Sequence, residues 1–220
     1  MRYKISFYLN SPISFTFKPI FDDLLLYCYI IDKHGYVPQP TTMTEENIIK
    51  LPDELLKKHN SGVRYCSYMM FEDSPYAESK SFWVKRFNQT KPELIKQTGK
   101  IDTQRGFYKS YKMPLRQIDL EKVWFIFDTE NKSEVERLCG HIHGIGKKRN
   151  QGMGEVERFE IKESDGKIIR PVPVAAIPGD KLVKNLESIG RVNKIYTRIE
   201  PPYWSQLNAA ECVEFDMNLL

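Results

Sequence analysis

The chain has 220 residues, of which 41% are hydrophobic and 12% aromatic, and its formal net charge is +4. This length and composition favour a folded globule with one substantial domain. No run of 18 apolar residues is present, which excludes a membrane-spanning helix, and the first residues alternate in polarity instead of forming a signal peptide, so we expect a cytoplasmic protein. The four cysteines lie far apart without a C-x-x-C pair, so we expect reduced thiols and no metal site.

The N-terminal part of the sequence predicts a strand followed by a helix. Residues 2–9 alternate apolar and polar side chains, as a half-buried strand does. Residues 21–33 contain a nearly continuous apolar run, with Asp22 and Asp23 in the first turn and Gly35 where a C-cap would stand. We therefore expect a helix that is buried on most sides.

The next predicted strand comes only after an irregular region. Residues 35–60 contain Pro38 and Pro40, and we expect no more than short helical turns near residues 45–50 and 53–58. Residues 63–71 then become strand-like. A turn after them leads the chain into a long basic excursion.

The second half repeats the pattern of strand, helix and strand. Residues 123–127 read as a buried strand, and the polar residues from Asn131 onward open a helix that continues to Ile142. A glycine-rich segment follows this helix. Residues 155–162 then alternate as a further strand.

Together these elements give the order βαββαβ, the ferredoxin-like arrangement that is also the skeleton of the RNA recognition motif (RRM), so the predicted class is α+β. The two inner strands are normally joined by a hairpin, whereas here about fifty residues separate them, which is typical of a functional insertion. We expect an RRM-like core over residues 1–162 with a basic insertion at 75–119. Residues 163–220 would form a C-terminal extension that packs on the core.

The glycine-rich segment, residues 144–154, contains two Gly-apolar-Gly units around five residues with three consecutive cations and no acid. Glycine permits positive φ and close backbone approach, so several main-chain N–H groups could point outward together and bind an anion. The order of helix, loop and strand does not fit a dinucleotide fingerprint, and Lys148 stands where a P-loop needs Ser or Thr. The candidate phosphate-binding residues are Gly144, Gly146, Lys147, Lys148, Arg149, Gly152 and Gly154.

A second basic island lies in the excursion between residues 80 and 116, which holds ten lysines and arginines against Glu93 and Asp102. The remainder of the chain is acidic, and two basic islands on an acidic body indicate a directed surface for a polyanion. Aromatic residues alternate with these cations, which suits single-stranded RNA, because rings stack on bases while Lys and Arg contact phosphates. Phe82 and Trp83 could instead pack beneath the insertion. The candidate contacts are Lys85, Arg86, Arg105, Phe107, Tyr108, Lys109, Tyr111 and Lys112.

The glycine-rich segment resembles the corresponding loop of the RAMP superfamily, the RNA-binding subunits and processing enzymes of CRISPR systems. The pattern of Gly-apolar-Gly, five residues with Lys or Arg, and Gly-apolar-Gly is matched over all eleven residues. Residues 21–26 are similar to the first-helix signature of this group, and the basic excursion stands where its 5′-capping subunits carry a thumb. Residues 170–174 and 201–204 resemble the small subunit that caps the 5′ handle in type IV CRISPR effector complexes.

This resemblance implies a non-catalytic RNA-binding subunit without a cofactor. The glycine-rich segment would hold phosphates of the 5′ handle of the CRISPR RNA (crRNA), and the thumb would contact flanking nucleotides. The core would pack on a neighbouring backbone subunit, with a large subunit as a further candidate partner. Target DNA would be recognised through base pairing with the guide and not by this chain.

Two other functions stay open. His141 and His143 precede the glycine-rich segment, and RAMP endoribonucleases cleave repeat RNA by metal-free general acid–base chemistry, for which histidine is suited. The same histidines could simply favour a helix C-terminus. The other alternative is a stand-alone RNA-recognition module, although the candidate patch at residues 201–204 is more typical of a subunit that also docks on protein.

Overall fold

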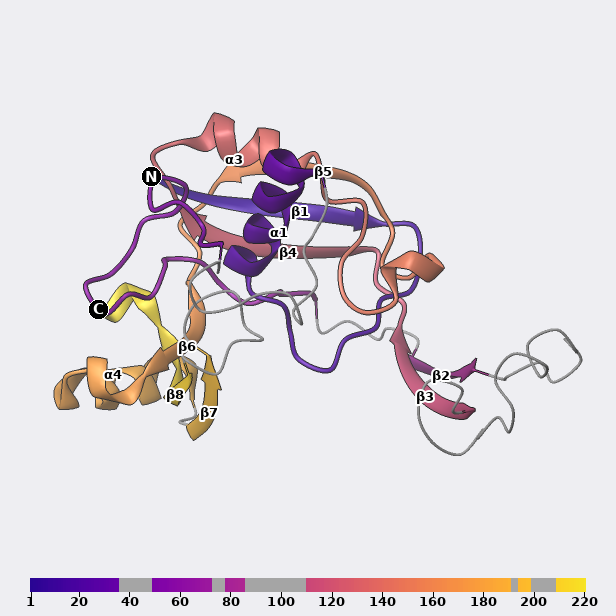
Figure 1. Cartoon of the computed structure of the whole chain (residues 1–220). Helices are drawn as coiled ribbons and strands as arrows, with labels where there is room; N and C mark the ends of the chain where they lie inside the picture. The colour runs from indigo at the N-terminus through magenta and orange to yellow at the C-terminus, as the bar shows by residue number, and fades with distance from the viewer. Residues whose placement is uncertain (36–48, 73–77, 86–109, 191–193, 199–208) are drawn as a thin grey trace, which may run out of the picture.

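The computed structural model describes residues 1–35, 49–72, 78–85, 110–190, 194–198 and 209–220, and Figure 1 shows their arrangement. These residues form a mixed α/β structure with three antiparallel sheets, which confirms the predicted mixture of helices and strands. The central sheet has the order β4-β1-β5, formed by β1 (Arg2–Leu9), β4 (Lys122–Asp128) and β5 (Val156–Glu163). A ribbon pairs β2 (Glu78–Lys85) with β3 (Tyr111–Ile118). The third sheet has the order β6-β8-β7, formed by β6 (Ile169–Pro173), β7 (Lys194–Arg198) and β8 (Ala209–Asp216).

One face of the central sheet forms the main hydrophobic core. Tyr3, Ile5 and Phe7 of β1 are buried on this face, as their alternation with polar residues predicts. Helices α1 (Phe21–His34) and α3 (Lys132–Cys139) cover the same face (Figure 1). Side chains of the opposite parity therefore point away from the helices, and we call the side that they occupy the outer face.

The ends of both helices have local causes in the sequence. Helix α1 ends at Gly35, as predicted, where φ is 70° and the Gly35 N–H donates to the Ile31 carbonyl (2.8 Å). Helix α3 begins after Asn131, whose side chain accepts the Glu134 N–H (3.3 Å). It ends at Cys139, before the predicted end at Ile142, because the following N–H groups donate to carbonyls three residues earlier and tighten the last turn. None of the described helices is long and apolar enough to cross a membrane.

The predicted strand at residues 63–71 is replaced by isolated bridges beside β4, one at Cys66 and another at Met70. Between them, Ser67 donates its N–H to the Ile126 carbonyl (2.8 Å), while its hydroxyl accepts the Ile126 N–H (2.9 Å). The Ser67 hydroxyl thus replaces a backbone group in the hydrogen-bond pattern beside β4. Residues 63–71 therefore run along β4 but do not form a continuous strand. Upstream, residues 53–55 form a turn where a helical turn was expected at 53–58, and most of the other expected turn at 45–50 lies outside the described residues.

The ribbon of β2 and β3 lies inside the predicted insertion and extends away from the central sheet (Figure 1). At its base, Leu115 and Ile118 are buried. Ile118 exchanges two backbone hydrogen bonds with Ile13 (2.8 and 2.9 Å). Residues 86–109, which link the two strands, lie outside the described residues. The insertion is therefore attached to the hydrophobic core through β3.

The third sheet packs with helix α4 (Gly179–Ile189) and with the 3-10 turns η4 (Val174–Ala176) and η5 (Met217–Leu219) in a second hydrophobic cluster. A buried ion pair joins this part of the chain to α1. The Arg170 guanidinium of β6 donates to the Asp22 carboxylate (3.1 Å) and to the Arg64 carbonyl (2.8 Å), and the Asp22 and Arg170 side chains are fully buried. Each charge needs the other there, because an isolated ion in the protein interior is very costly.

Replacing Asp22 with alanine should lower the free energy of unfolding by about 3–5 kcal/mol, because the buried Arg170 guanidinium would lose the carboxylate to which it donates. The matched control is Asp32→Ala, which removes a carboxylate that pairs with the exposed Arg137 (2.7 Å). Exposed pairs contribute little, so the control should lose much less stability. Urea denaturation of both variants measures the difference, and equal losses would contradict a linking role for the buried pair.

Candidate nucleic-acid interface

The glycine-rich segment closes on itself and on the loop that follows β1. The Ile145 N–H donates to the Gly154 carbonyl (2.8 Å), which joins the two Gly-apolar-Gly units. The Lys147 N–H donates to Ser14 (2.6 Å) and the Gly154 N–H to Pro12 (3.0 Å). These three N–H groups bond to carbonyls of the same fold, whereas the sequence suggested N–H groups that point outward. Anion binding at this loop therefore cannot use these three N–H groups.

Two of the glycines allow a very close backbone approach. A Cβ atom at Gly154 would stand 2.0 Å from the Ile145 carbonyl oxygen, and one at Gly146 would stand 2.5 Å from the Ser14 carbonyl oxygen. Both glycines also have positive φ, +62° and +92°. Gly152 has positive φ as well, but nothing lies within 4 Å of its added Cβ. The pattern of glycines thus builds a tight loop by removing side chains from crowded positions.

The three loop cations differ in their surroundings. Lys147 and Arg149 are exposed, and Lys148 is half-buried with a φ of 60°, in the left-handed region that few residues other than glycine adopt. The Arg149 guanidinium lies over the ring of Tyr27 on α1, 4.4 Å from its centroid. This cation–π contact orients Arg149 and places it on the helical side of the central sheet.

A carboxyl group near Arg149 titrates close to neutral pH. Asp23, in the first turn of α1, is half-buried, and burial together with the neighbouring Asp22 raises its pKa to about 6. Arg149 opposes this shift, because a nearby cation favours the ionised carboxylate. The positive charge of the loop is therefore partly offset at neutral pH and less so below about pH 6.

The glycine-rich segment also contacts the base of the ribbon, at one end of the molecule (Figure 1). The Gln117 side-chain amide donates to the sulfur of Met153 (3.5 Å), and Met153 is buried. Ile13 links both parts, because it pairs with Ile118 of β3 and its side chain would stand 3.0 Å from a Cβ at Gly146. The turn η3 (Arg149–Gln151) of the loop consequently lies beside the ribbon.

The ribbon presents cations and rings to solvent. The Lys112 ammonium lies 4.0 Å from the ring centroid of Phe82, and the strand register places both residues on one face of the ribbon. Phe82 is 53% exposed, so its ring does not pack beneath the insertion. Val84 and Met113 are also exposed. Exposed rings beside cations are suited to single-stranded nucleic acid, which offers base faces and phosphates together.

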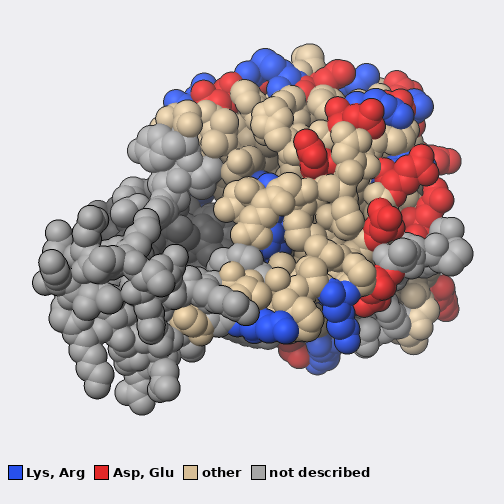
Figure 2. Space-filling view, turned by 90° about the vertical axis from the view of Figure 1, so that its right-hand side faces the viewer, with Lys and Arg blue, Asp and Glu red and all other residues tan. Residues whose placement is uncertain are grey.

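Negative charge surrounds the end of β1 next to this interface. The Leu9 N–H donates to the Glu121 carbonyl (2.9 Å) and the Asn10 N–H to the Glu155 carbonyl (3.0 Å), so both glutamates flank the strand end. Asp119 and Glu157 are exposed close to them in the sequence. Figure 2 views this end of the molecule and shows Asp and Glu gathered toward its right-hand edge. A polyanion would be directed away from that edge.

Among the predicted site residues, the structure places the glycine-rich segment and Lys112 at one end of the molecule. The side chains of Lys85 on β2, Tyr111 on β3 and Trp83 lie outside the described atoms. The sequence did not predict the contacts of the loop with Ser14, Tyr27 and Gln117, because each depends on distant segments that only the fold brings together. The predicted contacts outside the described residues are Arg86, Arg105, Phe107, Tyr108 and Lys109.

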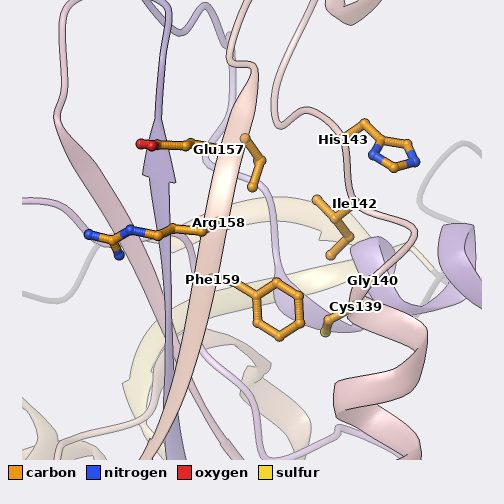
Figure 3. A pocket seen from close by; sticks show the side chains of 8 residues that line it. Cys139, Gly140, Ile142, His143, Glu157, Arg158 and Phe159 are labelled. Atoms are coloured by element: carbon orange, nitrogen blue, oxygen red, sulfur yellow. The ribbon is translucent and has the colours of Figure 1, made fainter.

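The two histidines occupy different environments. His141 Nε2 lies 3.5 Å from the carboxylate of Asp32, and the hydrogen-bonded Arg137 guanidinium lowers the pKa of that carboxyl to about 2. His143 is exposed at the rim of a cavity of about 300 Å³ between α3 and β5 (Figure 3). No group of three His, Cys, Asp or Glu side chains among the described residues is arranged to hold a metal ion.

The cavity at His143 is lined by both polar and apolar residues. In Figure 3, Ile142 and Phe159 line its floor, whereas Glu157 and Arg158 extend away from it across the β5 ribbon. Cys139 also lines the cavity, and burial raises the pKa of its thiol well above the usual value, so the thiol is protonated at neutral pH. Cleavage of RNA by the histidines stays a prediction from the sequence.

A family model matches most of the chain. Residues 57–214 match the family described as Csf3, a CRISPR type IV associated protein. The matched region covers more than two thirds of the chain and includes the ribbon, the glycine-rich segment and most of the third sheet. No curated protein matches the chain significantly.

Replacing Gly154 with alanine should destabilise the protein much more than replacing Gly152. Both positions have positive φ, so alanine adds left-handed strain of roughly 1–2 kcal/mol at each. Only at Gly154 does the new Cβ also overlap a carbonyl oxygen, that of Ile145. Chemical denaturation of the two variants isolates the cost of this overlap. Equal losses would show that the close approach at Gly154 is not required.

Asp23→Asn should change how stability depends on pH. Since the pKa of Asp23 in the folded protein is about 6 and its ordinary value is 3.8, the folded state holds a proton that the unfolded chain releases, and wild-type stability falls as pH rises through this range. The asparagine variant avoids this loss, so it should be more stable than wild type by roughly 1–3 kcal/mol at neutral pH, with the gain shrinking toward about pH 4. Asp32→Asn, at a carboxyl whose pKa is lowered to about 2, should show the opposite sign at neutral pH. Urea denaturation at neutral pH and at about pH 4 measures the stability change of both variants. An effect of Asp23→Asn that does not depend on pH would contradict this account.

Proposed function

The chain belongs to the Csf3 family of CRISPR type IV associated proteins and is thereby a type IV CRISPR subunit, and from this premise we propose that it binds the 5′ handle of the crRNA without catalysing a reaction. The glycine-rich segment contacts handle phosphates in this proposal, and the ribbon contacts the flanking nucleotides. The predicted metal-free nuclease and the stand-alone RNA-recognition module are the competing functions.

The observation that carries this proposal is the contact between the glycine-rich segment, with its three cations, and the base of the ribbon, through Met153 and Gln117. Lys147, Lys148 and Arg149 are held next to the ribbon by the Gln117–Met153 contact and by Ile13. The ribbon contributes Phe82 and Lys112, which combine a base-stacking ring with a phosphate-binding cation. In this proposal one strand of RNA uses both kinds of contact, first at the loop and then along the ribbon.

The same proposal assigns the core to the ferredoxin-like arrangement of the RAMP superfamily. The segment at residues 63–71 bonds to the free edge of β4, so the central sheet extends in the order of this segment, β4, β1 and β5, with every neighbour antiparallel. Helices α1 and α3 cover one face. This order and packing agree with the βαββαβ unit that the sequence suggests.

The partners in this proposal are the crRNA, a neighbouring backbone subunit and a large subunit of the complex. Target DNA contacts the complex through pairing with the guide, so the sequence of the target does not need to be recognised by this chain.

Replacing Lys147, Lys148 and Arg149 together with alanine should weaken binding of a repeat-derived RNA and reduce the slope of log K against log salt by about 2, because each single-stranded phosphate contact contributes about 0.7. The matched control replaces three exposed lysines elsewhere, Lys50, Lys57 and Lys184, and should leave the slope unchanged. Fluorescence anisotropy over a salt series measures both. Sequencing of RNA that co-purifies with the complex identifies the bound segment.

An unchanged slope in the loop variant would remove the loop from the RNA interface. The same RNA incubated with the protein in EDTA should stay intact. One discrete cleavage product that disappears on His141→Ala or His143→Ala would overturn the non-catalytic proposal in favour of the nuclease.

A further inference from the structure

The outer face of the central sheet gathers rings and cations from three strands. The pairing register places Tyr8 of β1 opposite Lys122 and Arg158, and Lys4 opposite Lys162. Trp124 stands opposite Ser6 on the same face. These residues lie outside both basic islands, so the charge pattern of the sequence did not single them out.

The cations on this face are held against the rings. The Arg158 guanidinium lies 3.5 Å from the ring centroid of Tyr8. The Lys4 and Lys122 ammonium groups lie 4.3 and 5.9 Å from the ring centroid of Trp124. Lys162 is exposed. Rings with cations at this distance offer base stacking and phosphate contacts within one nucleotide spacing.

The second hydrophobic cluster covers the Ile126 end of this face, and Trp124 packs partly against it. Arg2 donates to Asp128 (2.7 Å) and to the Gly166 carbonyl (3.1 Å), and a Cβ at Gly166 would stand 2.4 Å from Ile126. Residue 166 therefore lies directly on the sheet at the Ile126 end. Tyr8, at the other end, is half-exposed. Among the described residues this face is therefore covered at its Ile126 end and accessible to solvent at its Tyr8 end.

Charge complementarity identifies the class of partner. This face carries four cations, Lys4, Lys122, Arg158 and Lys162, against Glu72 and Glu160, with Glu121 and Glu157 at its Tyr8 end. The ion pairs of Glu72 and Glu160, at 2.9 to 3.5 Å, involve exposed or half-buried side chains, so they contribute little stability and can open when a phosphate approaches. Apolar partner surfaces suit this face poorly, because every ring on it lies beside a cation.

We propose that this outer face is a second binding surface for single-stranded nucleic acid. Bases stack on the Tyr8–Arg158 pair and on Trp124, while Lys4 and Lys162 contact phosphates. The surface is distinct from the glycine-rich segment, because Arg149 of that segment lies over Tyr27 of α1, which covers the opposite face of the sheet. The proposal therefore goes beyond handle binding and does not depend on it.

The test uses the full chain and two labelled 12-nucleotide probes, oligouridylate and its deoxy counterpart. The charge variant Lys4→Ala/Arg158→Ala/Lys162→Ala should bind at least one probe about tenfold more weakly, with a salt slope reduced by about 2. The control Lys50→Ala/Lys57→Ala/Lys184→Ala carries the same loss of charge and should bind as wild type does. Weaker binding of oligouridylate alone assigns the surface to RNA, and weaker binding of the deoxy probe alone assigns it to a DNA strand.

A second pair of variants tests stacking. Tyr8→Leu should weaken binding about fivefold or more, because it removes a ring, whereas Tyr8→Phe should bind as wild type does. Ultraviolet cross-links should map to peptides that contain Tyr8 or Trp124. The proposal is overturned if the charge variant binds both probes as its control does. Equal binding by the leucine and phenylalanine variants also overturns it, and the glycine-loop variant tests handle binding separately.

Discussion

The absence of room for a side chain at Gly146 and Gly154 is the constraint on which the candidate interface depends. The carbonyl oxygens of Ser14 and Ile145 occupy the space that a Cβ would need. The loop after β1 can therefore bond to the N–H groups of Lys147 and Gly154, and the same loop bonds to Ile118 at the base of the ribbon. The loop after β1 thus connects the glycine-rich segment to the base of the ribbon, although the two are distant in the sequence.

Aromatic rings hold cations in place at several of the described surfaces. Arg149 lies over Tyr27, Lys112 over Phe82 and Arg158 over Tyr8. A long cationic side chain loses rotamer entropy when it binds a phosphate, and prior contact with a ring removes part of that loss before binding. The rings therefore contribute even where a base does not reach them.

The sequence predicts those features that depend on local periodicity and on capping. The strand at residues 2–9, helix α1 with its cap at Gly35 and the Asn131 cap of α3 are all confirmed. It does not predict the interruption at Ser67, where a hydroxyl replaces a ladder contact, or the inward direction of the loop N–H groups. Both depend on which distant carbonyl or amide lies opposite, and that is fixed only by tertiary packing. The composition of the glycine-rich segment identifies a candidate site, but its geometry assigns the glycines to close packing and leaves the charge to the side chains.

The acidic end of β1 divides the positive surface into two parts. Glu121 and Glu155 flank the strand end, with the glycine-rich segment on the helical side of the sheet and the Tyr8–Arg158 pair on the outer face. Exposed charges are screened within about 8–10 Å at physiological salt, so the carboxylates repel phosphates only near that edge and leave the two surfaces electrostatically independent beyond it. A nucleic acid cannot follow the shortest path between them without passing the carboxylates. If both proposed surfaces bind nucleic acid, these carboxylates favour two separate strands, or two separate segments of one strand, over a single continuous track.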